Sequence, residues 1–242
     1  MEPPENMPET IQINFAHPFP LFPMAGVCLL PHATIPLHIF EPRYTKMVSE
    51  SLDGAGQIAL ATFQGEQWKH EYHGNPEVRP IVCLSQIERH EKLPMDRYNI
   101  LMQGICRARI LEEIMPTSEI PYRRAKLEPL ESNPDAHEAE LAAWRTRMQE
   151  LLDKDDMGRH KFQSKVLEWF ERDDIPSHVL IEIVGHLLMT TVDDSERRYQ
   201  LLSESNTLQR AEFTERQIKR LVCEISSAGG QITDWPKGMS WN

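Results

Sequence analysis

The sequence predicts an α+β protein in which β-strands make up the first half of the chain and helices make up the second. Short apolar runs with an alternating period, separated by glycine and proline, occupy residues 19–130. After Pro134, apolar residues recur at helical spacing instead. The polar segment 131–134, with sequence ESNP, lies between the two patterns and indicates a boundary between them.

The composition is that of an ordinary globular protein. The 242 residues are 40% hydrophobic and 26% charged, which suits one large or two small domains. The net charge of −11 opposes binding to nucleic acid and to anionic lipid. The acidic start MEPPENMPET does not resemble a signal peptide, and no apolar run is long enough to cross a membrane. We therefore expect a cytoplasmic protein.

Two short strands open the chain, and the second has two distinct faces. Ile35, Leu37 and Ile39 belong to one face of this strand, and they alternate with Pro36, His38 and Phe40 on the other. Because Pro36 cannot donate a ladder hydrogen bond, this strand either begins late or lies at an edge of the sheet.

A helix follows the second strand. Glu41 and Pro42 begin it, since proline is tolerated at the first helical position and a carboxylate suits the positive end of the helix dipole. Asp53 and Gly54 end it, and we expect Gly54 in the left-handed conformation. Its buried face is predicted to consist of Tyr44, Met47, Val48 and Leu52.

Four further strands are predicted, over residues 57–63, 81–89, 98–114 and 122–130. The first of them is apolar throughout and is expected to be buried on both faces. Gly104 interrupts the third and indicates a bulge or a barrel corner. Residues 65–80 are polar and punctuated by glycine and proline, which predicts a long loop, and residues 92–97 predict a turn.

Two arginines after Gly104 are expected to face water. Arg107 and Arg109 alternate with small and apolar neighbours, which should point inward. With Arg123 and Arg124 they form the evident basic cluster of the chain.

Five helices are expected after Pro134. The first two carry the apolar stripes Leu141, Trp144, Met148, Leu151 and Leu152, and Phe162, Val166, Trp169 and Phe170. The third begins at Pro176 and is apolar around much of its circumference, so we expect it at the centre of a bundle. A fourth spans residues 193–205, with Asp193 and Glu196 at capping-box spacing, and a fifth spans residues 208–225.

The segment 19–44, FPLFPMAGVCLLPHATIPLHIFEPRY, resembles the opening of the substrate-recognition domain of the ATP-dependent Lon proteases. The family's pattern reads F-P-L, P-G and P-x-x-x-x-P-L-H-I-F-E-P-R-Y; here Met24 and Ala25 separate Pro23 from Gly26. The resemblance continues in RYNILMQG-x-x-R-A-R-I and P-Y-x-x-A-x-L-E-P-L and covers roughly residues 18–132.

The resemblance implies a PUA-like six-stranded pseudo-barrel with one inserted helix, followed by an α-helical bundle. The expected division is a disordered N-terminus over residues 1–11, the barrel over 12–132, the bundle over 133–226 and a flexible tail over 227–242. Structural roles are expected for the motif residues Pro36, Leu37, His38, Phe40, Glu41, Pro42, Arg43, Tyr44 and Gly104.

The function that the resemblance implies is recognition of unfolded or exposed apolar polypeptide segments, as an adaptor or regulator in ATP-dependent proteolysis. The partner would be a separate ATP-dependent protease. RNA binding, which PUA-like barrels carry out in other families, and another kind of protein–protein interaction are the alternatives.

No catalytic or cofactor motif is recognisable in the chain. A nucleotide loop G-x-x-x-x-G-K-[ST] needs a Gly-Lys pair, which does not occur, and neither does a G-x-S-x-G elbow. The proteolytic Ser/Lys domain of Lon has no counterpart, so we expect a protein that is not an enzyme and uses no cofactor. His70 and His73 have no third ligand at a recognised spacing, which favours a solvated loop over a metal site. The four cysteines are far apart and are expected to be free thiols, mostly buried.

Trp68 and Tyr72 are the candidate substrate-binding residues. They are large aromatic residues in a polar loop, where no periodicity demands burial. Two interpretations of these residues stay open: they contact a bound polypeptide, which we call the client, or they pack against the barrel.

We predict that the purified chain hydrolyses neither ATP nor casein, because it lacks the phosphate loop and the nucleophile–base pair. Phosphate release and casein cleavage are the measurements. ATP turnover that follows the protein peak through a second purification would contradict this prediction.

Overall fold

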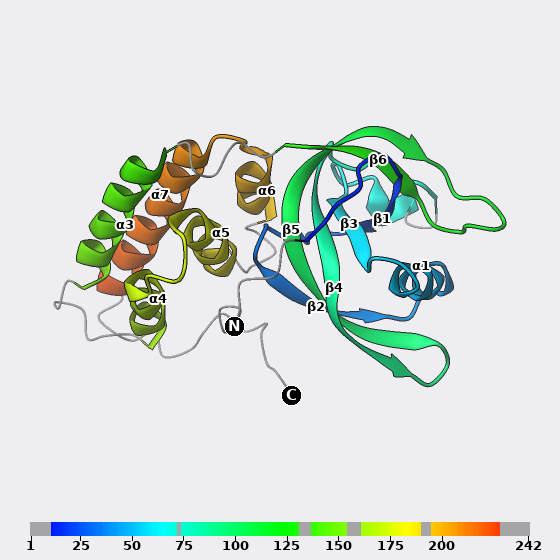
Figure 1. Ribbon diagram of the computed structural model, residues 1–242, viewed down its shortest axis with the longest axis horizontal. Helices are drawn as coiled ribbons and strands as arrows, with labels where there is room; N and C mark the ends of the chain where they lie inside the picture. Colours follow the sequence, from blue (N-terminus) through cyan, green and yellow to red (C-terminus); the bar gives the residue numbers. More distant parts are fainter. Residues whose placement is uncertain (1–10, 72–73, 131–136, 154–160, 190–194, 228–242) are drawn as a thin grey trace. The chain divides into compact units, whose positions relative to one another are not determined.

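The computed structural model describes residues 11–71, 74–130, 137–153, 161–189 and 195–227. The chain forms two units, Met1–Glu131 and Ser132–Asn242. The first is built mainly from strands and the second from helices, which confirms the predicted α+β class (Figure 1). The disorder predicted for residues 1–11 and the flexibility predicted for 227–242 concern segments that, apart from Ile11 and Ser227, lie outside the described residues.

Six strands form the first unit: β1 (Phe19–Met24), β2 (Thr34–Ile39), β3 (Gln57–Thr62), β4 (Ile81–Leu93), β5 (Arg97–Ile114) and β6 (Arg124–Pro129). β1 pairs with β3 in parallel and with β6 antiparallel, and the remaining pairs β3–β4, β4–β5 and β5–β6 are antiparallel. These pairings close a ring of five strands. Among the described residues β2 pairs with β5 alone, so it is an edge strand, which is one of the two alternatives that Pro36 predicted.

Strand β5 changes its neighbour at Gly104. Its residues 98–103 pair with β2, whereas residues 108–114 pair with β6. The register against β4 shifts at the same place, with Ser85 opposite Gly104 and Leu84 opposite Cys106, so Ile105 is the extra residue of a bulge. A Cβ on Gly104 would lie 2.2 Å from the carbonyl oxygen of Leu30, which leaves no room for any other residue. The predicted bulge is confirmed.

The inserted helix, α1 (Pro42–Leu52), begins at the predicted proline and buries Tyr44, Met47 and Val48. The helix ends at Leu52 with Asp53 as its C-cap, as predicted, but the left-handed glycine after it is Gly56, with a φ of +69°, and not Gly54. Its last residue Leu52 is only half-buried.

The segment 65–80 is more ordered than the predicted loop. It contains the short helix α2 (Trp68–Glu71), and Val78 forms an isolated bridge with Phe63. The predicted turn 92–97 is also shorter, because β4 extends to Leu93 and β5 begins at Arg97.

Arg107 does not face water, contrary to the prediction, since its side chain is only 1% exposed. Arg109 is exposed as predicted and lies beside Glu128. Alternation along a strand separates two faces, but it does not reveal whether something covers the second face. Strand β3 is buried along its whole length, as predicted.

The second unit contains α3 (Glu138–Leu152), α4 (Lys161–Glu171), α5 (Ser177–Leu188), α6 (Ser195–Ser203) and α7 (Thr207–Ser227). Helix α5 contacts the four others, and its residues 179–187 are all buried, which confirms the predicted central helix. Asp193 of the predicted capping box lies outside the described residues. The next helix, α7, is capped by Asn206, whose Oδ1 accepts hydrogen bonds from the backbone N–H groups of Leu208 and Gln209.

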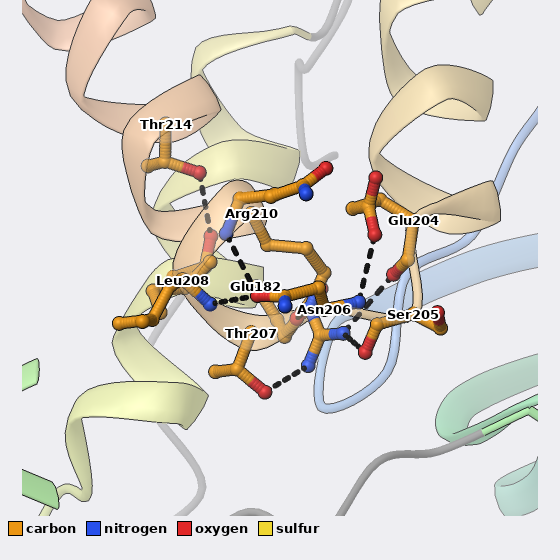
Figure 2. A network of polar contacts seen from close by, with 10 residues as sticks. Glu182, Glu204, Ser205, Asn206, Thr207, Leu208, Arg210 and Thr214 are labelled. Atoms are coloured by element: carbon orange, nitrogen blue, oxygen red, sulfur yellow. Dashed lines mark hydrogen bonds and ion pairs between the residues drawn. The ribbon is translucent and has the colours of Figure 1, made fainter. Parts of the chain in front are cut away.

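A buried ion pair joins α5 to α7. Arg210 Nε lies 2.9 Å from Glu182 Oε1, with both side chains at most 4% exposed. Arg210 also donates hydrogen bonds to the carbonyl oxygens of Glu204 and Ser205, at 3.0 and 2.8 Å, and to the hydroxyl of Thr207 (Figure 2). One guanidinium therefore neutralises a buried carboxylate and satisfies the carbonyls that follow α6.

His186 lies one turn beyond Glu182 on α5. Burial, reinforced by the charge of Arg198, lowers the pKa of His186 to about 3, so the imidazole is neutral at pH 7. The unfolded chain binds this proton near the usual pKa of 6.5. The contribution of His186 to stability is therefore complete above that pH and decreases as the pH falls towards 3.

A second arginine ties α3 to the end of α4. Arg145 Nε donates to the carbonyl oxygen of Phe170 at 2.8 Å, and Nη1 donates to that of Ile175 at 2.7 Å. A further bond reaches the carbonyl of Arg172. A cation at the carboxyl end of a helix also interacts favourably with the helix dipole.

We predict that Gly104→Ala destabilises the first unit by about 3 kcal/mol, because backbone rather than a flexible side chain blocks the added methyl group. Gly54→Ala is the control: its Cβ would meet only the Ser51 carbonyl oxygen at 3.6 Å, an ordinary contact. Urea denaturation of both variants is the measurement. Equal midpoints for the two variants would contradict the close approach at Gly104.

Arg145→Met is expected to destabilise the helical unit by about 2 kcal/mol, because partly buried carbonyl groups lose a charged donor. Arg147→Met is the matched control on the same helix. Arg147 is 55% exposed and lies 3.6 Å from Glu215, so its loss should cost less than about 0.5 kcal/mol. Thermal unfolding followed by circular dichroism compares the two variants, and equal effects would refute the role given to Arg145.

Candidate functional site

The motif of residues 36–44 divides into a buried half and an exposed half. Ile39 and Tyr44 are 3% and 4% exposed and belong to the core of the first unit. The exposed members are Pro36, His38, Phe40 and Pro42, which we call the exposed row. Phe40 is 63% exposed, although burial of an aromatic side chain is favourable. Packing explains the buried half of the motif and leaves the exposed row unexplained.

The buried half fixes the turn from β2 into α1. Glu41 and Arg43 form an ion pair, with 3.0 Å between Oε2 and Nη2. The Arg43 guanidinium lies 4.5 Å from the centre of the Tyr44 ring, and this ring packs against Phe22. Burial raises the pKa of Tyr44, so its phenol stays neutral. Leu37 is half-buried on the inward face of β2.

His38 makes a hydrogen bond across the sheet. Its Nδ1 lies 2.8 Å from Asn99 Oδ1, and Asn99 Nδ2 donates to Glu91 Oε2 at 3.2 Å. The three residues are register partners on β2, β5 and β4. The hydrogen bond of His38 therefore joins two strands and does not involve the turn into the helix. No local signal could have identified Asn99 and Glu91, which are 61 and 53 residues away in the chain.

Within the part of the chain that the structure describes, the backbone of β2 has a strand neighbour on one side only, and we call the other side its open side. Gly104 N–H donates to the carbonyl of Ala33, and bonded pairs recur at every second residue of an antiparallel ladder. Every second residue after Ala33, namely Ile35, Leu37 and Ile39, therefore directs its backbone N–H and C=O groups towards β5. The backbone groups of Thr34, Pro36 and His38 then face the open side, where the missing N–H of Pro36 breaks no ladder bond.

Other large apolar side chains are also exposed on the first unit: Met95, Leu111 and Met115. Met95 lies at the tip of the β4–β5 hairpin with a φ of +62°, and Leu111 lies where the β5–β6 register shifts. Phe40 differs from them because it is aromatic and belongs to the exposed row. Its ring also stacks on His38, with 6.0 Å between ring centres.

The other candidate residues lie elsewhere. Trp68 is half-buried, packs against the barrel core and stacks on Phe63 with 5.9 Å between ring centres. Tyr72 and His73 lie outside the described residues, and the part of the chain that is described contains no group of three metal-ligating side chains. Cys28 and Cys83 are buried and form no disulfide, whereas Cys223 is exposed.

The basic cluster does not form a surface. Arg107 is buried, and Arg123 is 5% exposed and donates to the carbonyl of Pro76 and to Glu113. Phosphate binding requires accessible cations, so this cluster offers no support for RNA binding. Among the helices described, none is both long and apolar enough to cross a membrane.

Comparisons with known proteins identify relatives. Residues 18–220 match the family model of the ATP-dependent protease La (LON) substrate-binding domain. The Lon protease of Desulfovibrio desulfuricans is 25% identical over 214 residues, which are 88% of this chain and 23% of that protease. The Lon protease of Trichlorobacter lovleyi is 34% identical over 98 residues, which are 38% of this chain and 11% of that protease. The chain thus spans less than a quarter of these relatives.

Two solved structures have a similar fold. The N-terminal domain of the Mycobacterium avium complex Lon protease superposes with a TM-score of 0.62 at 12% identity, covering 84% of this chain and 98% of that one. The Lon N-terminal domain protein of Xanthomonas campestris gives a TM-score of 0.51 at 18% identity, covering 86% and 98%. The family match confirms the resemblance seen in residues 19–44 and extends it through the helices. This chain therefore belongs to the family of Lon substrate-binding domains.

Proposed function

We propose that this chain binds unfolded or exposed apolar polypeptide segments without catalysing a reaction on them. Its family supports substrate recognition, and the exposed row on an open edge strand is the observation that carries the proposal to a surface. An extended segment can add to the open side of β2 through its backbone, while its side chains contact Phe40. Backbone pairing suits clients that share no sequence.

The chain's role in the cell follows from the same proposal. We propose that the chain acts as an adaptor or regulator in ATP-dependent proteolysis, since its family recognises substrates for that process. Its partner would be a separate ATP-dependent protease to which it delivers clients, or from which it withholds them. Co-purification of such a protease only when a destabilised client is present would support delivery.

Trp68 and Tyr72 are proposed as a second contact with the client. The stacking of Trp68 on Phe63 gives it a share in stability, but the residue is only half-buried, so part of its side chain stays accessible to a client. The effect of Trp68 on binding therefore has to be separated from its effect on folding.

We predict that Phe40→Ala weakens binding of fluorescein-labelled, reduced and carboxymethylated lactalbumin by roughly 30-fold, about 2 kcal/mol, and leaves the thermal midpoint nearly unchanged. The reason is that a side chain that is 63% exposed contributes little to folding. Fluorescence anisotropy and thermal unfolding are the measurements.

Leu111→Ala is the matched control, because Leu111 is 60% exposed and lies outside the exposed row. It should change neither binding nor stability. Trp68→Ala should lower the thermal midpoint. It should also weaken binding when binding is measured at a temperature below that midpoint. Unchanged binding by Phe40→Ala would refute the proposed surface, and loss of binding by Trp68→Ala alone would move it to α2.

A further inference from the structure

The exposed side chains of Glu91, Asn99 and His38 form a chain of hydrogen bonds, which we call the relay. Glu91 fixes which atoms donate and which accept along it. At neutral pH the Glu91 carboxylate can only accept hydrogen bonds. Its contact with Asn99, at 3.2 Å, therefore requires the amide nitrogen of Asn99 on that side. The amide oxygen of Asn99 then faces His38, at 2.8 Å from Nδ1. Glu91 thus decides which way the amide points.

The relay decides the tautomer of His38. Because the amide oxygen of Asn99 is an acceptor, Nδ1 of His38 must carry the proton that it donates. In the neutral ring Nε2 then has no proton and can only accept a hydrogen bond. A neutral imidazole in water prefers the opposite tautomer, with its proton on Nε2. The strands β4 and β5 therefore impose on His38 a state that the free side chain does not favour.

The open side of β2 is richer in acceptors than in donors. The carbonyls of Thr34, Pro36 and His38 face it, but proline supplies no N–H, so only Thr34 and His38 can donate. Nε2 of His38 adds an acceptor from a side chain on the same strand. The complement of such an edge is an extended backbone with its N–H groups intact.

We infer that His38 recognises a backbone N–H of the bound polypeptide through Nε2, with Asn99 and Glu91 as positioning residues that hold the accepting tautomer. This inference rests on the proposed function and adds a rule of selection to it. The site accepts an extended apolar segment and rejects one with a proline or N-methylated residue opposite His38, because that segment leaves Nε2 without a donor.

The tautomer is tested without any client. In the full chain labelled with ¹⁵N-histidine, long-range ¹H–¹⁵N spectra distinguish a ring protonated at Nδ1 from one protonated at Nε2. We expect the Nδ1–H form for His38 in the wild type and a shift towards Nε2–H in Asn99→Leu. Lys92→Leu, a change of an exposed neighbour of Glu91, should leave the tautomer as it is. An Nε2–H ring in the wild type would overturn the inference and leave the proposed function untouched.

Binding is tested with a fluorescein-labelled peptide of alternating leucine and serine, and with copies N-methylated at one position each. We expect the wild type to bind one N-methylated peptide about fivefold more weakly than the peptides methylated at the adjacent positions. This factor corresponds to the loss of one hydrogen bond. His38→Leu should bind the unmodified peptide about fivefold more weakly and should no longer distinguish that copy, so that the two losses do not add. Asn99→Leu should behave in the same way, with thermal midpoints unchanged because all three side chains are exposed.

The outcomes separate the two proposals. If Phe40→Ala weakens binding and His38→Leu still distinguishes the same copy, the role of His38 is refuted and the proposed surface stands. If the wild type binds neither the peptide nor unfolded lactalbumin, the proposed function fails, and the inference fails with it.

Discussion

The first unit depends on a close approach between two backbones at Gly104. Strand β5 must leave β2 and join β6 partway along its length, while the segment before β2 crosses it at that point. The N–H of His32 donates to the carbonyl of Gly104 at 2.8 Å, and the N–H of Gly104 donates to Ala33 at 2.9 Å. Only a residue without a side chain allows this crossing, since the Leu30 carbonyl occupies the place of a Cβ. Closure of the five-stranded ring and the edge position of β2 both follow from it.

The helical unit is held together by side chains that satisfy the ends of other helices. Arg145 reaches carbonyls in the last turn of α4 and after it, and Arg210 reaches carbonyls that follow α6 while it neutralises Glu182 on α5. Buried carbonyl groups are costly without donors, so each arginine fixes one connection of the bundle. A buried pair such as Glu182 and Arg210 adds little net stability compared with apolar packing, but removing one partner is costly. The pair therefore favours one arrangement of α5, α6 and α7.

The candidate site results from the alternation of a single strand. The same motif supplies Ile39 and Tyr44 to the core and presents Phe40 and His38 at the surface. Because β2 has one neighbour among the described residues, its second side keeps backbone groups that an extended chain can use. A surface of this kind can recognise backbone and apolar character rather than a particular sequence, which agrees with the proposed binding of unfolded segments.

The sequence by itself determined the fold class and the central place of α5. It also reduced two features to two alternatives each: a late start or an edge position for β2, and a bulge or a barrel corner at Gly104. Each depends on a local property: a missing N–H, a missing side chain or the period of apolar residues. Only the tertiary structure decided that Arg107 is buried and that Trp68 stacks on Phe63, because coverage of a surface depends on segments distant in the chain. The relay from Glu91 through Asn99 to His38 was equally invisible, since strand register brings its members together. Periodicity shows which side chains share a face, and tertiary packing decides what that face meets.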